Sequence, residues 1–291
     1  MSGPHYMFLS ALGFALMGAL VKMAGAAEIP LLQIILVRAV ISVVLSLSDI
    51  ARAKVHPLGE RRWLLLARGV VGFISLSCVF YAVLNLPFAE ATLLQYLHPV
   101  FTAGLAFLLL REVPGKGTVI CVLLSLVGLG VMLVPNTPVT GADGNWLAVL
   151  AGLAGAFGSG LAYTIVRKLA STEHPSVIVM YFPMVCIPAA VLLGVHDFIW
   201  PSAIGWLILI GVGCFAQLGQ LALTKAMRTD IASRAASFSY IQIVFAALLG
   251  MVLFDEMPSL YTLIGAGFII LGAVINAVIK AQPQSATASA R

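Results

Sequence analysis

Long apolar runs, each of about 18 residues or more, recur along almost the whole of this 291-residue chain. An α-helix rises about 1.5 Å per residue, so a run of this length can cross a hydrocarbon core about 30 Å thick. Hydrophobic residues make up 61% of the chain and charged residues 9%. A soluble domain is about 25% charged, because its surface must face water. The sequence therefore predicts an all-α polytopic membrane protein.

Ten such runs can be placed between shorter, more polar connectors. We predict ten transmembrane helices, at residues 6–26, 29–48, 64–84, 88–110, 118–135, 146–166, 177–195, 203–224, 232–254 and 259–279. The remaining residues at the end, 282–291, are small and polar and are expected to form a disordered tail.

The basic residues gather in alternate connectors. After the second, fourth, sixth, eighth and tenth runs these are Arg52, Lys54, Arg61 and Arg62; Arg111 and Lys116; Arg167 and Lys168; Lys225, Arg228 and Arg234; and Lys280 and Arg291. The connectors 85–88, 136–145, 196–202 and 255–258 contain no Lys or Arg. Short cytoplasmic loops are enriched in these residues. The pattern predicts a multi-pass inner (plasma) membrane protein with both termini and the tail in the cytoplasm, and no nucleic-acid partner.

The two halves of the chain resemble each other. Residues 108–133 align without gaps to residues 252–277, and the alignment pairs Glu112 with Glu256, Pro114 with Pro258 and Gly128 with Gly272. Each half holds five predicted spans, an odd number, so the second half must be inverted relative to the first. We expect two inverted repeats, at 1–140 and 141–281. Inverted repeats around a central site are typical of alternating-access secondary transporters.

Several segments also resemble one known family. "ILVRAVIS" (35–42) has an Arg within the second span, and "FYAVLNLPFAEATLLQYLHPVFTAGLAFLLLREV" (80–113) has a Pro in the fourth span and a closing Leu-rich segment that ends in Glu. With "LGAVI" near the end, these segments resemble the EamA-type members of the drug/metabolite transporter superfamily. The resemblance implies a ten-span exporter or importer of small metabolites, and it does not indicate which one.

The stretch "ATLLQYLHPV" (91–100) places polar residues at the centre of the fourth span. Thr92, Gln95, Tyr96 and Pro99 fall on one helix face. Pro99 has no N–H, so it is expected to kink the helix and leave the Gln95 carbonyl without its helical partner. A free carbonyl in lipid is costly, so this face should point inward. We expect Gln95 and Tyr96 to contact substrate and Pro99 to act as a hinge.

Two further groups of candidates follow from this stretch. The repeat places Ser239 and Tyr240 on the corresponding face of the ninth span, where Tyr96 and Tyr240 could flank one cavity or simply be packed core aromatics. His98 either has a protonation-linked role or donates to the carbonyl that Pro99 exposes. Glu90, near the outer start of the fourth span, is a coupling or gating candidate together with His98 and Pro99.

Arg38 lies at the middle of the second span, where a charged side chain must face the bundle interior or a wet cavity. It either binds a substrate anion or gates, or it stabilises the bundle by bonding to carbonyls or neighbouring polar groups. The other substrate-binding candidates come from polar positions within the third, sixth and eighth spans: Ser75, Tyr81, Ser159, Tyr163, Gln217 and Gln220.

Chemical motifs are missing from the sequence. There is no GxxxxGK[ST], HExxH or GxSxG, and the four cysteines lie in four different spans without CxxC spacing. We therefore expect no catalytic residues, no metal site and no cofactor.

These features together favour a secondary-active transporter, an exporter or exchanger, that moves a small polar or amphipathic metabolite such as an amino acid or vitamin-like compound by alternating access. The main alternative is a proton-coupled multidrug or organic-cation exporter; an intramembrane enzyme and a channel are less well supported. The expected partners are a small-molecule substrate, the lipid bilayer and protons as a candidate coupling ion, with the chain a monomer or weak dimer.

Overall fold

A computed structural model describes residues 3–85, 94–133, 146–254 and 260–279, and the regular elements in these ranges are all helices. They are α1 (Gly3–Ala26), α2 (Leu31–Ala53), α3 (Arg62–Asn85), α5 (His98–Leu110), α6 (Lys116–Leu133), α7 (Trp146–Leu169), α8 (Pro175–Gly194), η2 (Val195–Asp197), α9 (Ala203–Thr229), α10 (Ala232–Ser237), η3 (Phe238–Tyr240), α11 (Ile241–Phe254) and α12 (Leu260–Val278). Each of the ten predicted ranges overlaps at least one of these helices.

Eight of the described helical segments are long and apolar enough to cross a membrane, and α5 and α6 are shorter apolar helices. Large apolar side chains face outward from these helices. Leu108 and Leu192, for example, expose 71% and 81% of their surface. An outer surface of this kind suits lipid and not water. The prediction of an all-α polytopic membrane protein is confirmed.

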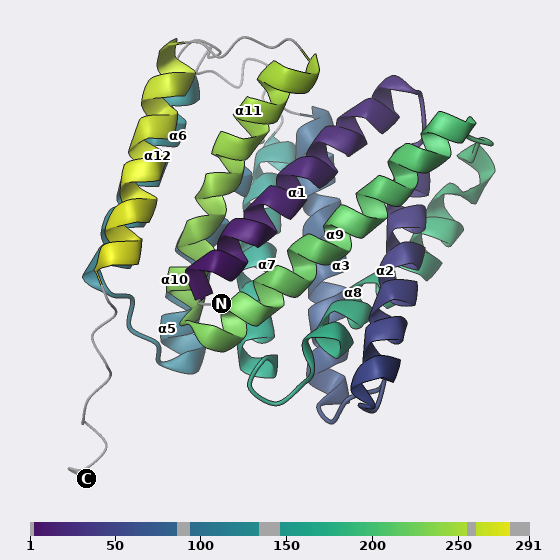
Figure 1. Ribbon diagram of the computed structural model, residues 1–291, viewed down its shortest axis with the longest axis horizontal. Helices are drawn as coiled ribbons and strands as arrows, with labels where there is room; N and C mark the ends of the chain where they lie inside the picture. Colours follow the sequence, from purple (N-terminus) through teal and green to yellow (C-terminus); the bar gives the residue numbers. More distant parts are fainter. Residues whose placement is uncertain (1–2, 86–93, 134–145, 255–259, 280–291) are drawn as a thin grey trace.

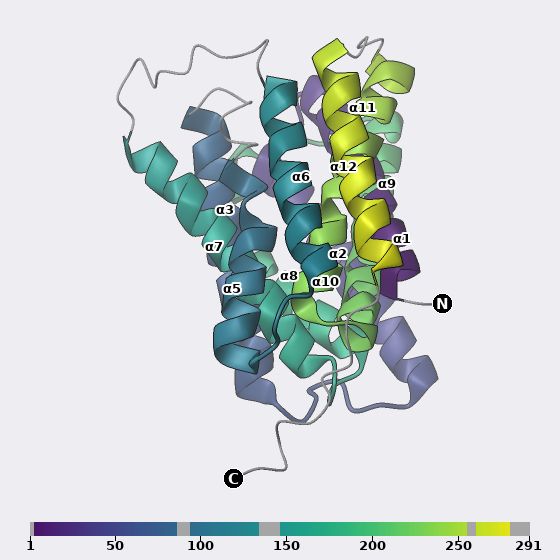
Figure 2. The same cartoon turned by 90° about the vertical axis from the view of Figure 1, so that its left-hand side faces the viewer.

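The helices pair across the two halves of the chain. The most extensive contacts join α1 with α9, α3 with α7, α2 with α8 and α6 with α12. The next most extensive join α5 with α7, α1 with α11, α2 with α9 and α3 with α8. In Figure 1 the pair α6 and α12 lies at one side of the bundle and α2 at the other, and Figure 2 shows α6 and α12 side by side.

Glycines allow the closest of these approaches. A Cβ added at Gly128 of α6 would lie 2.5 Å from the carbonyl oxygen of Gly265 in α12, and one added at Gly272 of α12 would lie 3.1 Å from the carbonyl oxygen of Cys121 in α6. Small residues let the backbones of membrane helices come together in this way. The two contacts are reciprocal, because each helix presents a glycine to a backbone carbonyl of the other.

Two of the predicted spans are interrupted. In the described part of the fourth, residues 94 and 95 are helical, residues 96 and 97 form a turn, and α5 then begins at His98. The interruption thus precedes Pro99, which lies in the first turn of α5 instead of kinking a continuous helix; its missing N–H has no helical partner there anyway. The ninth span is divided into α10, η3 and α11.

At one end of the bundle, Glu112 connects three elements. Its Oε1 accepts a hydrogen bond from Arg167 Nε at the end of α7 (2.7 Å), and its Oε2 accepts one from the backbone N–H of Ala232 at the start of α10 (2.8 Å). Arg167 Nη1 also donates to the carbonyl of Met227 in α9 (2.7 Å). The ends of α5, α7, α9 and α10 are therefore held together by one largely buried ion pair.

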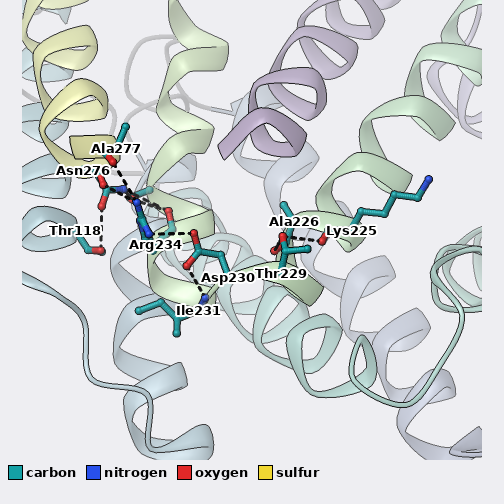
Figure 3. Close-up of polar contacts among 10 residues, drawn as sticks. Thr118, Lys225, Ala226, Thr229, Asp230, Ile231, Arg234, Asn276 and Ala277 are labelled. Carbon is teal, nitrogen blue, oxygen red and sulfur yellow. Dashed lines mark hydrogen bonds and ion pairs between the residues drawn. The ribbon is translucent and has the colours of Figure 1, made fainter. Parts of the chain in front are cut away.

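A second cluster of polar side chains, around Arg234 and Asn276, extends these interhelical contacts to α12 and α6 (Figure 3). Arg234 lies between Asp230, 3.5 Å from its Oδ2, and the carbonyl of Asn276, to which it donates at 3.1 Å. The Asn276 side chain contacts Ser237 Oγ (2.7 Å) and Thr118 Oγ1 (3.2 Å). Interhelical polar contacts of this kind help to fix the arrangement of membrane helices. Each stabilises the folded protein by about 0.6 kcal/mol on average.

The carboxyl group of Asp230, in the connector between α9 and α10, has a pKa above its ordinary value because it is largely buried; Arg234 opposes this shift. A raised pKa in the folded state means that the contribution of Asp230 to the free energy of unfolding is greatest below the ordinary carboxyl pKa and decreases as the pH rises through the raised value. We expect Asp230→Asn to remove this decrease, so that the melting temperature of the variant relative to wild type rises between about pH 4 and about pH 7.

This prediction can be measured by thermal unfolding of the purified protein in detergent at the two pH values. The matched control is Asp197→Asn, which removes a carboxyl group from an exposed position in η2 and is measured at the same two pH values. A melting-temperature difference for Asp230→Asn that falls with rising pH would contradict the prediction.

Candidate functional site

A cavity of about 210 Å³ lies inside the bundle, where both interrupted spans meet their neighbours. Its lining combines aromatic, amide, hydroxyl and guanidinium groups with a few apolar side chains. The lining residues are Phe14, Met17, Arg38, Arg68, Gly72, Ser75, Leu76, Val79, Gln95, Tyr96, His98, Ser159, Ala162, Tyr163, Phe182, Gln220 and Gln242. Pockets for drug-sized ligands have volumes of about 300–1,000 Å³, so this cavity is suited in size to a smaller molecule.

Many of the residues selected from the sequence come together here. Those that line the cavity are Arg38, Ser75, Gln95, Tyr96, His98, Ser159, Tyr163 and Gln220, which come from α2, α3, α5 and the turn before it, α7 and α9. They are separated by up to 182 positions in the chain, from residue 38 to residue 220, and only the packing of the helices brings them together. Their role in binding a substrate stays a prediction.

Other candidates lie elsewhere. Gln217 is buried away from the cavity lining, and its side-chain amide donates to Ser46 Oγ of α2 at 2.8 Å. Tyr81, on α3, is 38% exposed and is not part of the lining. Pro99 is buried in the first turn of α5. Glu90 lies outside the described residues, as does Glu256.

An aromatic cluster closes one side of the cavity. The rings of Tyr96 and Tyr240 are stacked, with centroids 6.2 Å apart and planes at 28°. The ring of His98 meets the ring of Tyr163 edge to face at 5.2 Å. Tyr240 itself is almost completely buried behind Tyr96. The matched tyrosines of the two halves are therefore in direct contact, with Tyr96 facing the cavity and Tyr240 behind it.

His98 joins the two interruptions. Its Nδ1 lies 3.1 Å from the carbonyl oxygen of Gln95, which confirms the contact predicted for a carbonyl near Pro99. A carbonyl can only accept, so Nδ1 carries the proton. In the neutral ring Nε2 then accepts a hydrogen bond from the hydroxyl of Ser239 in η3, 3.2 Å away. Ser239 and His98 thus connect the interruption before α5 to that before α11.

A hydroxyl pair connects α3 and α7 at the cavity wall. Ser75 Oγ donates to the carbonyl of Gly155 at 2.6 Å and lies 2.8 Å from Ser159 Oγ. Both serines are thereby oriented by the helix pair that carries them, and they can still offer a hydroxyl lone pair to a bound molecule.

Two arginines lie against one aromatic ring. The guanidinium carbons of Arg38 (α2) and Arg68 (α3) lie 5.5 and 5.3 Å from the ring centroid of Phe182 (α8). A cation–π contact contributes about 0.5–2 kcal/mol, whereas burial of an unpaired ion costs several kcal/mol. The ring therefore offsets only part of the cost of burying these charges.

Arg68 was not selected from the sequence. It lies just inside the predicted third span, 64–84, close to Arg61 and Arg62 of a connector that the positive-inside pattern assigns to the membrane surface. The signal that could have identified it is its position: it is six residues beyond Arg62, and α3 begins at Arg62, so Arg68 lies nearly two turns inside the helix.

The lining contains two guanidinium groups and no Asp or Glu side chain from the described residues. Nor does the described part of the chain contain a group of His, Cys, Asp and Glu that could hold a metal ion. The arrangement can bind a polar molecule by hydrogen bonds and charge.

Comparisons with known proteins agree with this architecture. The chain is 32% identical over 274 residues to the pseudopaline exporter CntI of Pseudomonas aeruginosa, and the alignment covers 94% of this chain and 95% of that protein. It is 30% identical over 186 residues to a riboflavin transporter of Vibrio cholerae, covering 64% of this chain and 61% of that protein. It is 24% identical to human solute carrier family 35 member G1, covering 79% of this chain and 66% of that protein.

A solved crystal structure has the same fold, with a TM-score of 0.78 at 20% identity over 92% of this chain and 95% of that one. The profile of the EamA-like transporter family matches residues 1–134 and 146–278, which together make up most of the chain. The family suggested by the resemblance of residues 35–42 and 80–113 is therefore confirmed: this chain belongs to the EamA-like transporter family.

Proposed function

We propose that this chain is a secondary-active transporter, an exporter or exchanger, that moves a small polar or amphipathic metabolite across the inner membrane by alternating access. The observation that carries the proposal is the polar cavity at which the two interrupted spans meet. Broken helices that surround a central cavity form the binding sites of many secondary transporters. The relatives named above include transporters of metabolites, which supports a substrate of that size.

We also propose that the halves, 1–140 and 141–281, are inverted five-span repeats. The most extensive helix contacts have the symmetry that such repeats would produce. Their set stays unchanged when each helix is exchanged for its counterpart: α1 for α7, α2 for α8, α3 for α9, α5 for α11 and α6 for α12. The reciprocal glycine contacts of α6 and α12 and the stacked pair Tyr96 and Tyr240 obey the same exchange. Opening to one side and then to the other would follow from rocking of one half on the other.

The orientation with both termini in the cytoplasm follows from the basic connectors. Modification of single engineered cysteines by a membrane-impermeant reagent in intact cells tests it. A cysteine in the connector 54–61 should be protected and one in the connector 198–202 labelled, and the reverse pattern would overturn the orientation.

The rival function, export of organic cations, is less well supported by the cavity. A lipophilic cation would be expected to meet a carboxylate in the membrane, as buried charges are paired. The described lining residues include Arg38 and Arg68 and no acid. An amino acid or vitamin-like compound with an acidic group fits this lining better than a cation does.

Tyr96→Ala should reduce transport at least tenfold in proteoliposomes while the protein stays folded. Tyr96 faces the cavity and stacks on Tyr240 across the halves, so its removal alters the binding surface at the centre. Tyr96→Phe keeps the stacked ring, worth about 0.5–1.5 kcal/mol for an aromatic pair, and tests the hydroxyl alone. Saturable counterflow of radiolabelled amino acids and riboflavin is the measurement.

The matched control is Tyr261→Ala, since Tyr261 is 45% exposed on α12 and lies outside the lining. It should transport at the wild-type rate. If Tyr96→Ala lowers the melting temperature but transports at the wild-type rate for each folded molecule, Tyr96 is a packing residue and its assignment to the site is wrong.

A further inference from the structure

The paired arginines of the cavity point to the chemical class of its ligand. Arg68 is 4% exposed, and its Nε and Nη1 atoms are buried without a hydrogen-bond partner. In the part of the chain that the structure describes, neither Arg38 nor Arg68 forms an ion pair or hydrogen bond. Arginine does not lose its proton in proteins, so these charges cannot be removed by titration. The described chain therefore supplies no anion to either guanidinium group.

Gly72 makes room for the Arg68 guanidinium beside the Phe182 ring. A Cβ added at Gly72, one helical turn further along α3, would clash with Arg68 Nη1 and lie 2.8 Å from the Phe182 ring. The glycine thus permits the guanidinium to lie against the Phe182 ring, which the Arg38 guanidinium also contacts. The guanidinium is held in one place by packing instead of by an acid, which leaves its Nε and Nη1 donors without a protein partner.

The rest of the cavity is suited to the body of an organic molecule. Ser159 and Gln220 offer hydroxyl and amide groups, and the rings of Tyr96 and Tyr163 offer flat apolar faces. Guanidinium groups bind carboxylate and phosphate oxygens through two parallel hydrogen bonds, a geometry that other cations do not match. Two guanidinium groups beside neutral polar groups select a ligand that carries an acid at one end.

We propose that the cavity binds an organic anion of metabolite size, with its acidic group, a carboxylate or a phosphate, held between Arg68 and Arg38. This inference rests on the proposed function, because it takes the cavity to be the transport site. It adds Arg68 to the binding residues and narrows the substrate from polar metabolites in general to those with an acidic group.

Thermal unfolding of the purified full-length protein in dodecyl maltoside tests binding directly. Succinate and citrate represent carboxylates, glycerol 3-phosphate and inorganic phosphate represent phosphates, and succinamide and choline are the uncharged and cationic controls, all at one ionic strength. A ligand that binds only the folded state raises the melting temperature. We expect a rise with one class of anion, which identifies the acidic group, and none with succinamide or choline. A rise with only the controls, or with none of the compounds, overturns the proposal.

Variants locate the binding. Arg68→Gln and Arg38→Gln should each raise the dissociation constant of the anion at least tenfold. The matched controls Arg62→Gln (start of α3) and Arg52→Gln (last turn of α2) remove the same charge from exposed positions on the same helices and should bind as wild type does. Equal loss in all four variants would mean that the anion responds only to net charge, and the proposal would fall.

The same variants distinguish a ligand site from a structural charge. Without anion, Arg68→Gln should melt at or above the wild-type temperature, because it removes a buried unpaired charge. A marked fall would make Arg68 a structural residue and overturn the proposal. Gly72→Ala keeps both charges but displaces the Arg68 guanidinium, so it too should lose anion binding if the position of that group matters.

Flux separates this inference from the proposed function. In proteoliposomes, one outcome is that the anion binds in a manner that requires Arg68 and yet shows no saturable transport. That result would support the anion-binding site and contradict the proposed transport function. If Arg68→Gln instead transports a neutral or cationic metabolite saturably and at the wild-type rate, the proposed transport function is supported and the anion-binding site is contradicted.

Discussion

Replacing Glu112 with alanine should lower the free energy of unfolding by about 3 kcal/mol, which is the lower end of the range measured when one partner of a buried ion pair is removed. The side chains of Glu112 and Arg167 are 12% and 24% exposed, so the charge left on Arg167 would be poorly hydrated. The variant also leaves the Ala232 N–H, at the start of α10, without its acceptor. Three helix ends lose a common contact at once.

The measurement is equilibrium unfolding in detergent, read as the midpoint and the slope with denaturant. Lys168→Ala is the control, since Lys168 is the exposed neighbour of Arg167 in the last turn of α7, and it should change stability by less than about 0.5 kcal/mol. Glu112→Gln retains one acceptor oxygen and should fall between the two. A double-mutant cycle with Arg167→Ala isolates the pair. Equal stability of Glu112→Ala and Lys168→Ala would show that the ion pair stabilises nothing.

Gly128→Ala should destabilise the protein by about 1–3 kcal/mol through overpacking. The added methyl group would lie 2.5 Å from the Gly265 carbonyl oxygen and 3.0 Å from the Phe268 Cβ, and backbone atoms cannot move aside as a flexible side chain can. The expected result is separation of α6 from α12, the helix pair at one side of the bundle in Figure 1.

The same helix supplies the control. Gly130 has no atom within 4 Å of its would-be Cβ, so Gly130→Ala should be neutral or stabilise by up to about 1 kcal/mol through helix propensity. Gly272→Ala, whose Cβ would lie 3.1 Å from the Cys121 carbonyl oxygen, should lie between them. The predicted order of melting temperatures is therefore Gly130→Ala, then Gly272→Ala, then Gly128→Ala. Any other order would show that the close approach of α6 and α12 does not limit stability.

Much of the fold could be predicted from the sequence, because helices in a membrane satisfy their own backbone hydrogen bonds and so depend on local composition and length. Apolar length located the membrane-crossing helices, and the segments 35–42 and 80–113 indicated the family. Pro99 marked an interruption to within three residues, because a missing N–H is a local property. Gln95 and Tyr96 were predicted to face inward from the same stretch, and both line the cavity.

The contacts between helices could not be predicted in this way. Gln217 and Gln220 lie on one stripe of α9, yet Gln220 lines the cavity while Gln217 bonds to Ser46 of α2. The difference depends on which neighbouring helix covers each part of the stripe. Periodicity gives the faces of a helix but not its neighbours, since those are set by packing between segments far apart in the chain.

Arg68 shows most clearly which properties follow from the sequence and which follow only from the packing of the helices. From the sequence alone it is one of several basic residues near a membrane surface, where Lys and Arg are common. Only the packing of α3 against α8 buries its guanidinium on Phe182, which Arg38 also contacts, with no acid beside it among the described residues. The sequence by itself determined that the chain is a helical membrane protein of this family, because that follows from local apolarity and short motifs. The tertiary structure alone decided which charges share one cavity, because the free energy of a buried charge depends on what surrounds it.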